Sequence, residues 1–267
     1  MKKIILFSLL VVAMVGCNTK QKELRRAEAR VAAAQQLVNE GNLNAAKLQL
    51  DSVHLLYPKQ VDARRSAKAL MDSIVYIEAQ RNLHYSDSLL QPLLPQVDNL
   101  LKKFKCEKNG EYEFYGRYVH KQLPTDKNFN RCFLQAYVNE DVRITMKSYY
   151  CGQKAINHDK LTLTVGEDYQ TASGSTHSFE TDGCKYEILN LSEEDALSAL
   201  KFIAAHEKDR IKVTLTGSSD YAYYLNQTEK QALTETCRLA LLMLDVRQLE
   251  QQVNIAQAQI DKYENKH

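Results

Sequence analysis

The sequence contains many serine, histidine and acidic residues, but few of them stand at the spacings that catalysis or metal binding requires. Gly174-Ser175-Thr176-His177 places a serine near a histidine in a polar stretch, without the Gly-x-Ser-x-Gly turn of many hydrolases. His206-Glu207 lacks the second histidine of a zinc-protease motif. No glycine-rich phosphate loop is found among only nine glycines. The sequence therefore predicts that the protein is not an enzyme and has no metal or cofactor.

The cysteines offer thiol chemistry instead. None forms a Cys-x-x-Cys pair or has a histidine at zinc-finger spacing, which disfavours a structural metal site. Two disulfides are considered alongside free thiols: Cys132 with Cys151, at the far ends of an expected hairpin, and Cys106 with Cys184. Cys237 falls among apolar residues of a long helix and is expected to be a buried free thiol.

Tyrosine is abundant in the strand-rich part of the chain and could form a binding face, because tyrosine is enriched at protein interfaces. Tyrosine is also typical of half-buried strands, and this structural interpretation is the one that the pattern favours. The residues of the candidate face are Tyr112, Tyr115, Tyr118, Tyr149, Tyr150, Tyr221, Tyr223 and Tyr224.

Residues 17–104 are predicted to be helical. An apolar stripe at spacings of three and four runs from Leu24 to Val38, and Gly41-Asn42 ends that helix. Pro92 and Pro95 should split the last helical segment. Within this region, Gly41, Leu43, Ala46, Leu50, Val53 and Pro58 stand at the spacings of one tetratricopeptide repeat. Residues 27–60 resemble that unit, although Arg30 and Ala33 depart from it. Because no second copy follows, we expect a helical hairpin and no peptide-binding superhelix.

Residues 105–226 show the period-two alternation of strands. The expected strands cover residues 112–120, 131–138, 142–150, 161–165, 184–189, 211–216 and 221–225. Residues 171–176 are expected to be a polar loop, and one helix, capped by Ser192, interrupts the strands. These features predict an antiparallel sheet or small sandwich with the helix packed on it.

Residues 227–267 form a long helix in which Thr228 and Gln231 resemble a capping box. Its apolar positions from Leu239 to Tyr263 follow the three-four spacing of a coiled-coil seam. We expect the stripe of the first helix to cover this seam; homodimerisation through the C-terminal helix is the rival. The predicted fold class is therefore α+β: N-terminal helical hairpins, a β-rich middle domain with one helix, and a long C-terminal coiled-coil-like helix.

The first residues carry a targeting signal. Lys2 and Lys3 precede an apolar run, Ile4 to Val15, that is too short to span a bilayer and has the length of a secretory signal core. Met14-Val15-Gly16-Cys17 resembles the lipobox of bacterial lipoproteins. The resemblance implies a signal peptide, residues 1–16, that is removed, and lipidation of Cys17 by diacylglycerol and a further acyl chain such as palmitate. An uncleaved signal anchor or a plain secretory peptide is the alternative.

No aspartate follows Cys17 and no acidic run is nearby, so the resemblance implies the outer membrane, facing the periplasm. With 35 basic and 33 acidic residues, the chain has a net charge of +2, which gives no reason to expect nucleic-acid binding. The chain resembles Gram-negative envelope lipoproteins. We expect a non-catalytic binding or scaffolding module that recruits a protein or glycan. One alternative is an envelope hydrolase built around His158 or His177. A purely structural or stress-related lipoprotein is another.

Overall fold

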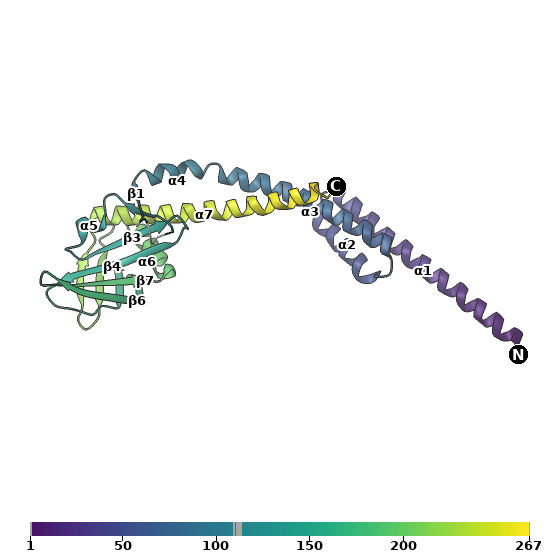
Figure 1. Ribbon diagram of the computed structural model, residues 1–267, viewed down its shortest axis with the longest axis horizontal. Helices are drawn as coiled ribbons and strands as arrows, with labels where there is room; N and C mark the ends of the chain where they lie inside the picture. The colour runs from purple at the N-terminus through teal and green to yellow at the C-terminus, as the bar shows by residue number, and fades with distance from the viewer. Residues whose placement is uncertain (1, 109, 111–113, 267) are drawn as a thin grey trace. The chain divides into compact units, whose positions relative to one another are not determined.

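The computed structural model describes residues 2–108, 110 and 114–266, and the side chains from Lys20 onward (Figure 1). It confirms that the chain mixes helix and sheet and ends in a long helix. The chain forms two compact units, which are described separately. The helical unit comprises Met1–Ser88 and Glu250–His267, and the sheet unit comprises Leu89–Leu249. Among the described residues, no helix is both long enough and apolar enough to cross a membrane.

Three helices build the core of the helical unit: α1 (Lys2–Asn39), α2 (Leu43–Leu56) and the part of α3 (Val61–Leu90) that belongs to this unit. Gly41 lies between α1 and α2 with a φ of 79°, which suits glycine, and the Asn42 side chain caps α2. The apolar stripe of α1 packs against α2 and α3. The buried residues of this core are Ala27, Ala34, Leu43, Ala46, Leu50, Val53, Ala63, Ala67 and Ile74.

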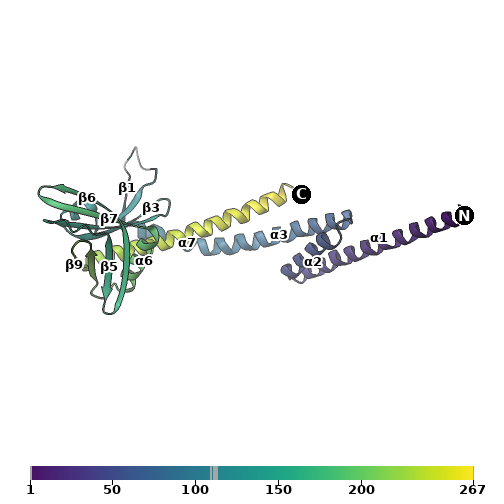
Figure 2. The ribbon, with the colours of Figure 1, turned by 90° about the horizontal axis from the view of Figure 1, so that it is seen from below.

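The last part of α7 (Gln227–Glu264) lies beside α3 in the helical unit (Figure 2). The rings of Tyr76 and Tyr263 stack with their centroids 4.4 Å apart, and Ser86 donates a hydrogen bond of 3.1 Å to Gln252. The expected pairing of the first helix with the last is therefore wrong for the described residues. The stripe of α1 is covered by α2 and α3, and α3 covers the end of α7.

A continuous antiparallel sheet forms the sheet unit, with the strand order β1-β2-β3-β4-β7-β6-β5-β8-β9. Its long strand β6 pairs along its first half with β5 and along its second half with β7. The polar loop expected at residues 171–176 is therefore wrong, because these residues continue β6. The strands are β1 (Phe104–Glu107), β2 (Arg117–His120), β3 (Phe133–Asn139), β4 (Ile144–Gly152), β5 (Lys160–Val165), β6 (Asp168–Thr181), β7 (Cys184–Leu191), β8 (Lys212–Thr216) and β9 (Tyr221–Tyr224).

Two helices bury their apolar faces against this sheet: α6 (Glu193–Ala205) and the first part of α7. The predicted cap of α6 is confirmed, since Ser192 accepts a hydrogen bond from the backbone N–H of Asp195. The cap predicted for α7 is wrong. Asn226 and Glu229 form a reciprocal capping box in which each side chain accepts the backbone N–H of the other, at 2.9 Å in both directions.

Two shorter helices complete the sheet unit, α4 (Leu94–Leu101) and α5 (Thr125–Asn128). The two prolines act as expected: α3 ends before Pro92, and α4 begins with Pro95 in its first turn. The structure divides the chain differently from the predicted ranges 17–104, 105–226 and 227–267. Residues 89–104 contact β1 through α4, and residues 227–249 contribute Ala232 and Leu233 to the sheet core.

Candidate functional site

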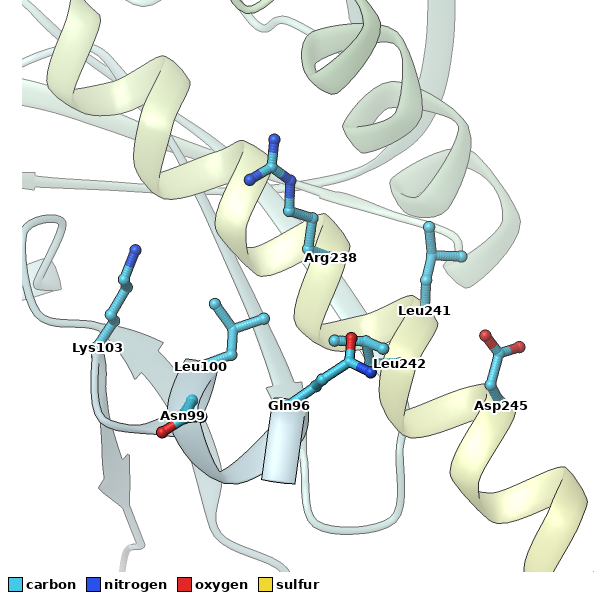
Figure 3. Close-up of a pocket in the computed structure, with 8 residues that line it drawn as sticks. All are labelled: Gln96, Asn99, Leu100, Lys103, Arg238, Leu241, Leu242 and Asp245. Carbon is cyan, nitrogen blue, oxygen red and sulfur yellow. The ribbon is translucent and has the colours of Figure 1, made fainter. Parts of the chain in front are cut away.

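A groove of about 610 Å³ lies between α4 and α7 in the sheet unit (Figure 3). Its volume falls within the range of ligand sites, but it is wide open to solvent on one side. That shape suits a segment of polypeptide better than an enclosed small molecule. The residues that line it are Gln96, Asn99, Leu100, Lys103, Arg238, Leu241, Leu242 and Asp245.

The spacing of these residues explains why they share one groove. On α7, positions 238, 241, 242 and 245 follow the i, i+3, i+4, i+7 pattern of a single helix face. Positions 96, 99, 100 and 103 follow the same pattern in and just after α4. In Figure 3, Leu100 and Gln96 extend from α4 toward α7, and Leu242 lies opposite them. The groove therefore has an apolar floor and a polar rim.

A buried carboxylate holds one end of this groove together. Glu235 accepts hydrogen bonds from Lys103 Nζ at 2.6 Å and Gln231 Nε2 at 3.3 Å, and His120 Nε2 lies 2.8 Å from its second oxygen. The backbone N–H of Gln122 donates a hydrogen bond to His120 Nδ1, so the ring proton is on Nε2, which donates a hydrogen bond to Glu235. Lys103, which follows α4, is thereby tied to α7.

The ionisation of Glu235 is shifted by these contacts. Burial raises the pKa of its carboxyl group, but the hydrogen bonds from Lys103, His120 and Gln231 outweigh burial and leave the net pKa lowered. A carboxylate whose pKa is lowered by folding stabilises the native state above its unfolded pKa. That contribution is lost as the pH falls through the folded value.

We therefore expect Glu235→Gln to lower the free energy of unfolding by about 2 kcal/mol at neutral pH. When the pH falls below about 4.3, the ordinary Glu pKa, the variant should lose less stability than the wild type. Glutamine at this position has no carboxylate to protonate, so this part of the acid-induced loss is absent. Urea unfolding at a series of pH values measures both effects. Glu250→Gln, at an exposed position of the same helix, is the control. Equal slopes of stability against pH in the wild type and Glu235→Gln would contradict this assignment.

Two further exposed charges of the groove, on Arg238 and Asp245, stand apart from that cluster. Arg238 has a side chain that is 64% exposed, and its ion pair among the described residues is a long one, 3.7 Å to Glu207. Asp245 is exposed and makes no ion pair with any residue that the structure describes. Because they lie seven residues apart on α7, about 10 Å along the axis, the leucines of the floor lie between a positive and a negative side chain.

The tyrosines of the candidate binding face do not form a single face. In the strand order, β2 and β9 lie near opposite ends of the sheet, which separates Tyr118 from Tyr224. Tyr149 is buried and its ring stacks on Phe133, so it serves the core. The Arg210 guanidinium lies 3.9 Å from the centre of the Tyr224 ring. Tyr112 lies outside the described residues.

The remaining tyrosines of the set fall into separate places. Tyr115 is exposed and precedes β2. Tyr150 of β4 and Tyr221 of β9 meet edge to face at 5.4 Å, and the Tyr223 ring lies 6.2 Å beyond Tyr221. Burial raises the pKa of Tyr223 well above its ordinary value. This group joins β4 to β9, and only Tyr221 in it is substantially exposed.

A second buried carboxylate, that of Glu187, lies in strand β7. Glu187 of β7 is fully buried and accepts the backbone N–H groups of Ile156, Asn157 and His158 at 2.7, 2.8 and 2.9 Å. The Nδ1 atom of the fully buried His158 ring lies 2.7 Å from the same carboxylate. Burial raises the pKa of Glu187, but these four hydrogen bonds outweigh it and the net pKa is lowered.

This pair is the carboxylate–histidine arrangement that a hydrolase would need, and sequence reasoning missed Glu187. The His158 Nε2 atom and the hydroxyl of Ser148 are buried and have no hydrogen-bond partner in the described structure. However, all three side chains have no solvent exposure, so a substrate has no path to them. The physical role that the geometry supports is attachment of residues 156–158 to β7. His177, the other candidate base, is exposed and its ring lies beside Phe179.

The cysteines described in the structure are free. Cys237 is buried, which confirms its prediction. The Cys106–Cys184 bridge, considered from the sequence as an alternative to free thiols, is wrong, because β2, β3 and β4 lie between the two strands. Cys132 and Cys151 are close, but the Cys132 sulfur contacts the backbone N and O atoms of Cys151, at 3.5 and 3.6 Å, instead of its thiol. No group of cysteine, histidine and acidic residues in the described chain could hold a metal ion.

Known proteins do not add a function to this geometry. No family model, no curated protein and no solved structure matches the chain. The side chain of Cys17, which carries the lipidation prediction, lies outside the described side chains. The groove between α4 and α7 is therefore the candidate binding site.

Proposed function

We propose that the protein is a lipid-anchored component of the bacterial cell envelope that binds a polypeptide partner in the α4–α7 groove and catalyses no reaction. The observation that carries the binding role is the groove itself: three half-buried leucines flanked by an exposed arginine and an exposed aspartate. The anchor rests on the lipobox-like segment that ends at Cys17. The expected location is the outer membrane, facing the periplasm.

The chain after Cys17 is compatible with such an anchor. Among the side chains that the structure describes, from Lys20 onward, the first buried one in α1 is Ala27, and nine residues separate Cys17 from it in the sequence. Lys20, Lys22, Arg25 and Arg26 lie in this short segment and could contact anionic headgroups. Residues 27–60, proposed as a tetratricopeptide-like hairpin, would then begin close to the bilayer surface.

The groove favours an amphipathic segment as its ligand. An apolar stripe of a partner helix would cover Leu100, Leu241 and Leu242, as in other helix-in-groove complexes. An acidic side chain of the partner would meet Arg238, and a basic one would meet Asp245. None of the described residues that line the groove is aromatic, and this favours a polypeptide over a glycan.

Affinity capture from native envelopes with full-length protein tests this proposal. Leu242→Asp and Arg238→Glu should each reduce recovery of the wild-type partner by about tenfold or more, since central interface residues can contribute 2 kcal/mol or more. Ile255→Asp introduces the same change at an exposed apolar position of α7 outside the groove and should leave recovery unchanged. Circular dichroism checks that each variant is folded. Equal capture by the wild type and both groove variants would contradict the proposal.

A hydrolase is the second candidate, and one observation favours it: the 2.7 Å contact between His158 and Glu187, with His158 Nε2 unpartnered. It requires an opening that exposes both residues. A reactive fluorophosphonate probe would detect an activated serine. Labelling that is lost in Ser148→Ala or His158→Ala, and retained in Ser175→Ala, would favour the hydrolase over the binding module.

A further inference from the structure

Two cysteines share one face of adjacent antiparallel strands. In the β4–β7 ladder Cys151 stands opposite Tyr186, and Cys184 lies two residues before Tyr186 on the same strand. Because side chains alternate along a strand, Cys184 and Tyr186 point to the same face as Cys151. The two thiols are therefore diagonal neighbours, and they belong to segments that are 33 positions apart in the chain.

The two thiols also interact with each other. Burial raises the pKa of Cys151, a hydrogen bond with Tyr186 lowers it, and the neighbouring Cys184 thiol raises it again. Both side chains are half-buried, so a small reagent can reach them. They lie where the strands end: β4 ends at Gly152, and β7 begins at Cys184, directly after the Asp182-Gly183 turn.

We propose that Cys151 and Cys184 form a reversible dithiol–disulfide pair, oxidised by exchange with a low-molecular-weight or protein disulfide. One thiolate of the pair attacks the oxidant's disulfide, forms a mixed disulfide and releases one thiolate. The second cysteine thiolate then attacks the protein sulfur of that mixed disulfide and releases the other. Two cysteine thiols thereby lose two protons and two electrons, and one oxidant disulfide becomes two thiols.

The geometry indicates a bridge that is easily reduced. Diagonal neighbours in an antiparallel sheet have α-carbons about 7–8 Å apart, whereas an unstrained disulfide needs about 4.4–6.8 Å. Closing the bridge therefore requires the strand ends to move, and strained bridges are the more reducible ones. Cys132 does not compete for Cys151, because its sulfur lies against the Cys151 backbone.

Peptide mapping tests this proposal, because trypsin places each of these cysteines on a different fragment. Cys132, Cys151 and Cys184 fall on residues 132–143, 148–154 and 161–185. The full-length protein is incubated with oxidised and reduced glutathione at varied ratios. Free thiols are then alkylated before digestion and mass spectrometry. We expect fragment 148–154 to be linked to 161–185, with Cys106, Cys132 and Cys237 alkylated.

Two variants make the result decisive. Cys184→Ser should abolish the linked fragment, and Cys132→Ser should leave it in place. Reduced glutathione should reopen the bridge while circular dichroism shows that the protein stays folded. A link between 132–143 and 148–154 would overturn the proposal. So would complete alkylation of Cys151 and Cys184 at every glutathione ratio.

Discussion

Replacing Glu187 with leucine is expected to lower the free energy of unfolding by about 3–5 kcal/mol, the usual cost of breaking a buried charged pair from one side. The carboxylate accepts four hydrogen bonds, three of them from consecutive backbone N–H groups. Leucine accepts none, and each buried N–H group left without a partner costs about 1–3 kcal/mol. Such a loss is a large fraction of the stability of an ordinary domain.

Urea unfolding followed by circular dichroism measures this loss. Glu187→Gln keeps one carbonyl oxygen and should lose less stability than Glu187→Leu. Glu180→Leu, at an exposed position of neighbouring β6, is the matched control and should change stability by less than about 1 kcal/mol. If Glu187→Leu and Glu180→Leu unfolded at similar urea concentrations, the Glu187 carboxylate would not be the group that attaches residues 156–158 to β7.

Replacing Cys17 with serine is expected to move nearly all of the protein from the membrane fraction to the aqueous fraction. Serine cannot form the thioether that carries the lipid, and the described helices include none that could span a bilayer instead. Acyl chains contribute about 0.8 kcal/mol for each buried CH₂ group, so their loss removes the main membrane affinity. Phase separation in a mild detergent, with immunoblotting, measures the distribution.

Cys237→Ser is the control for this substitution, because Cys237 is buried in the sheet unit and should not affect partitioning. An unprocessed Cys17→Ser chain could stay in the membrane through its uncut signal. For that reason a second form, with residues 1–17 replaced by a cleavable secretory signal, is compared in parallel. Membrane retention of that second form would show that something other than Cys17 holds the protein.

Much of the secondary structure could be predicted from local patterns. The stripe of α1, the Gly41-Asn42 break and the Ser192 cap each depend on residues within a few positions of one another. Strand β6 was missed because Ser, Thr and Gly dominate residues 171–176, where local preference indicates a loop. Pairing with β5 on one half and β7 on the other overrides that preference.

The candidate site could not be predicted, because it depends on which distant segments meet. Nothing local to residues 96–103 indicates that they face residues 238–245 of α7. Whether the tyrosines share a face likewise depends on the strand order, which separates β2 from β9. Glu187 did leave a signal: the alternation of β7 places it on the same face as Leu189 and Leu191, where a charged residue requires partners.

The most direct test of the account is the mass of the mature N-terminus in protein isolated from native bacterial envelopes. We predict a chain that begins at Cys17, without residues 1–16, and that carries diacylglycerol and a further acyl chain on this cysteine. A chain that still begins at Met1, or one that begins elsewhere and has no acyl mass, would contradict the proposed anchor and the envelope role that depends on it.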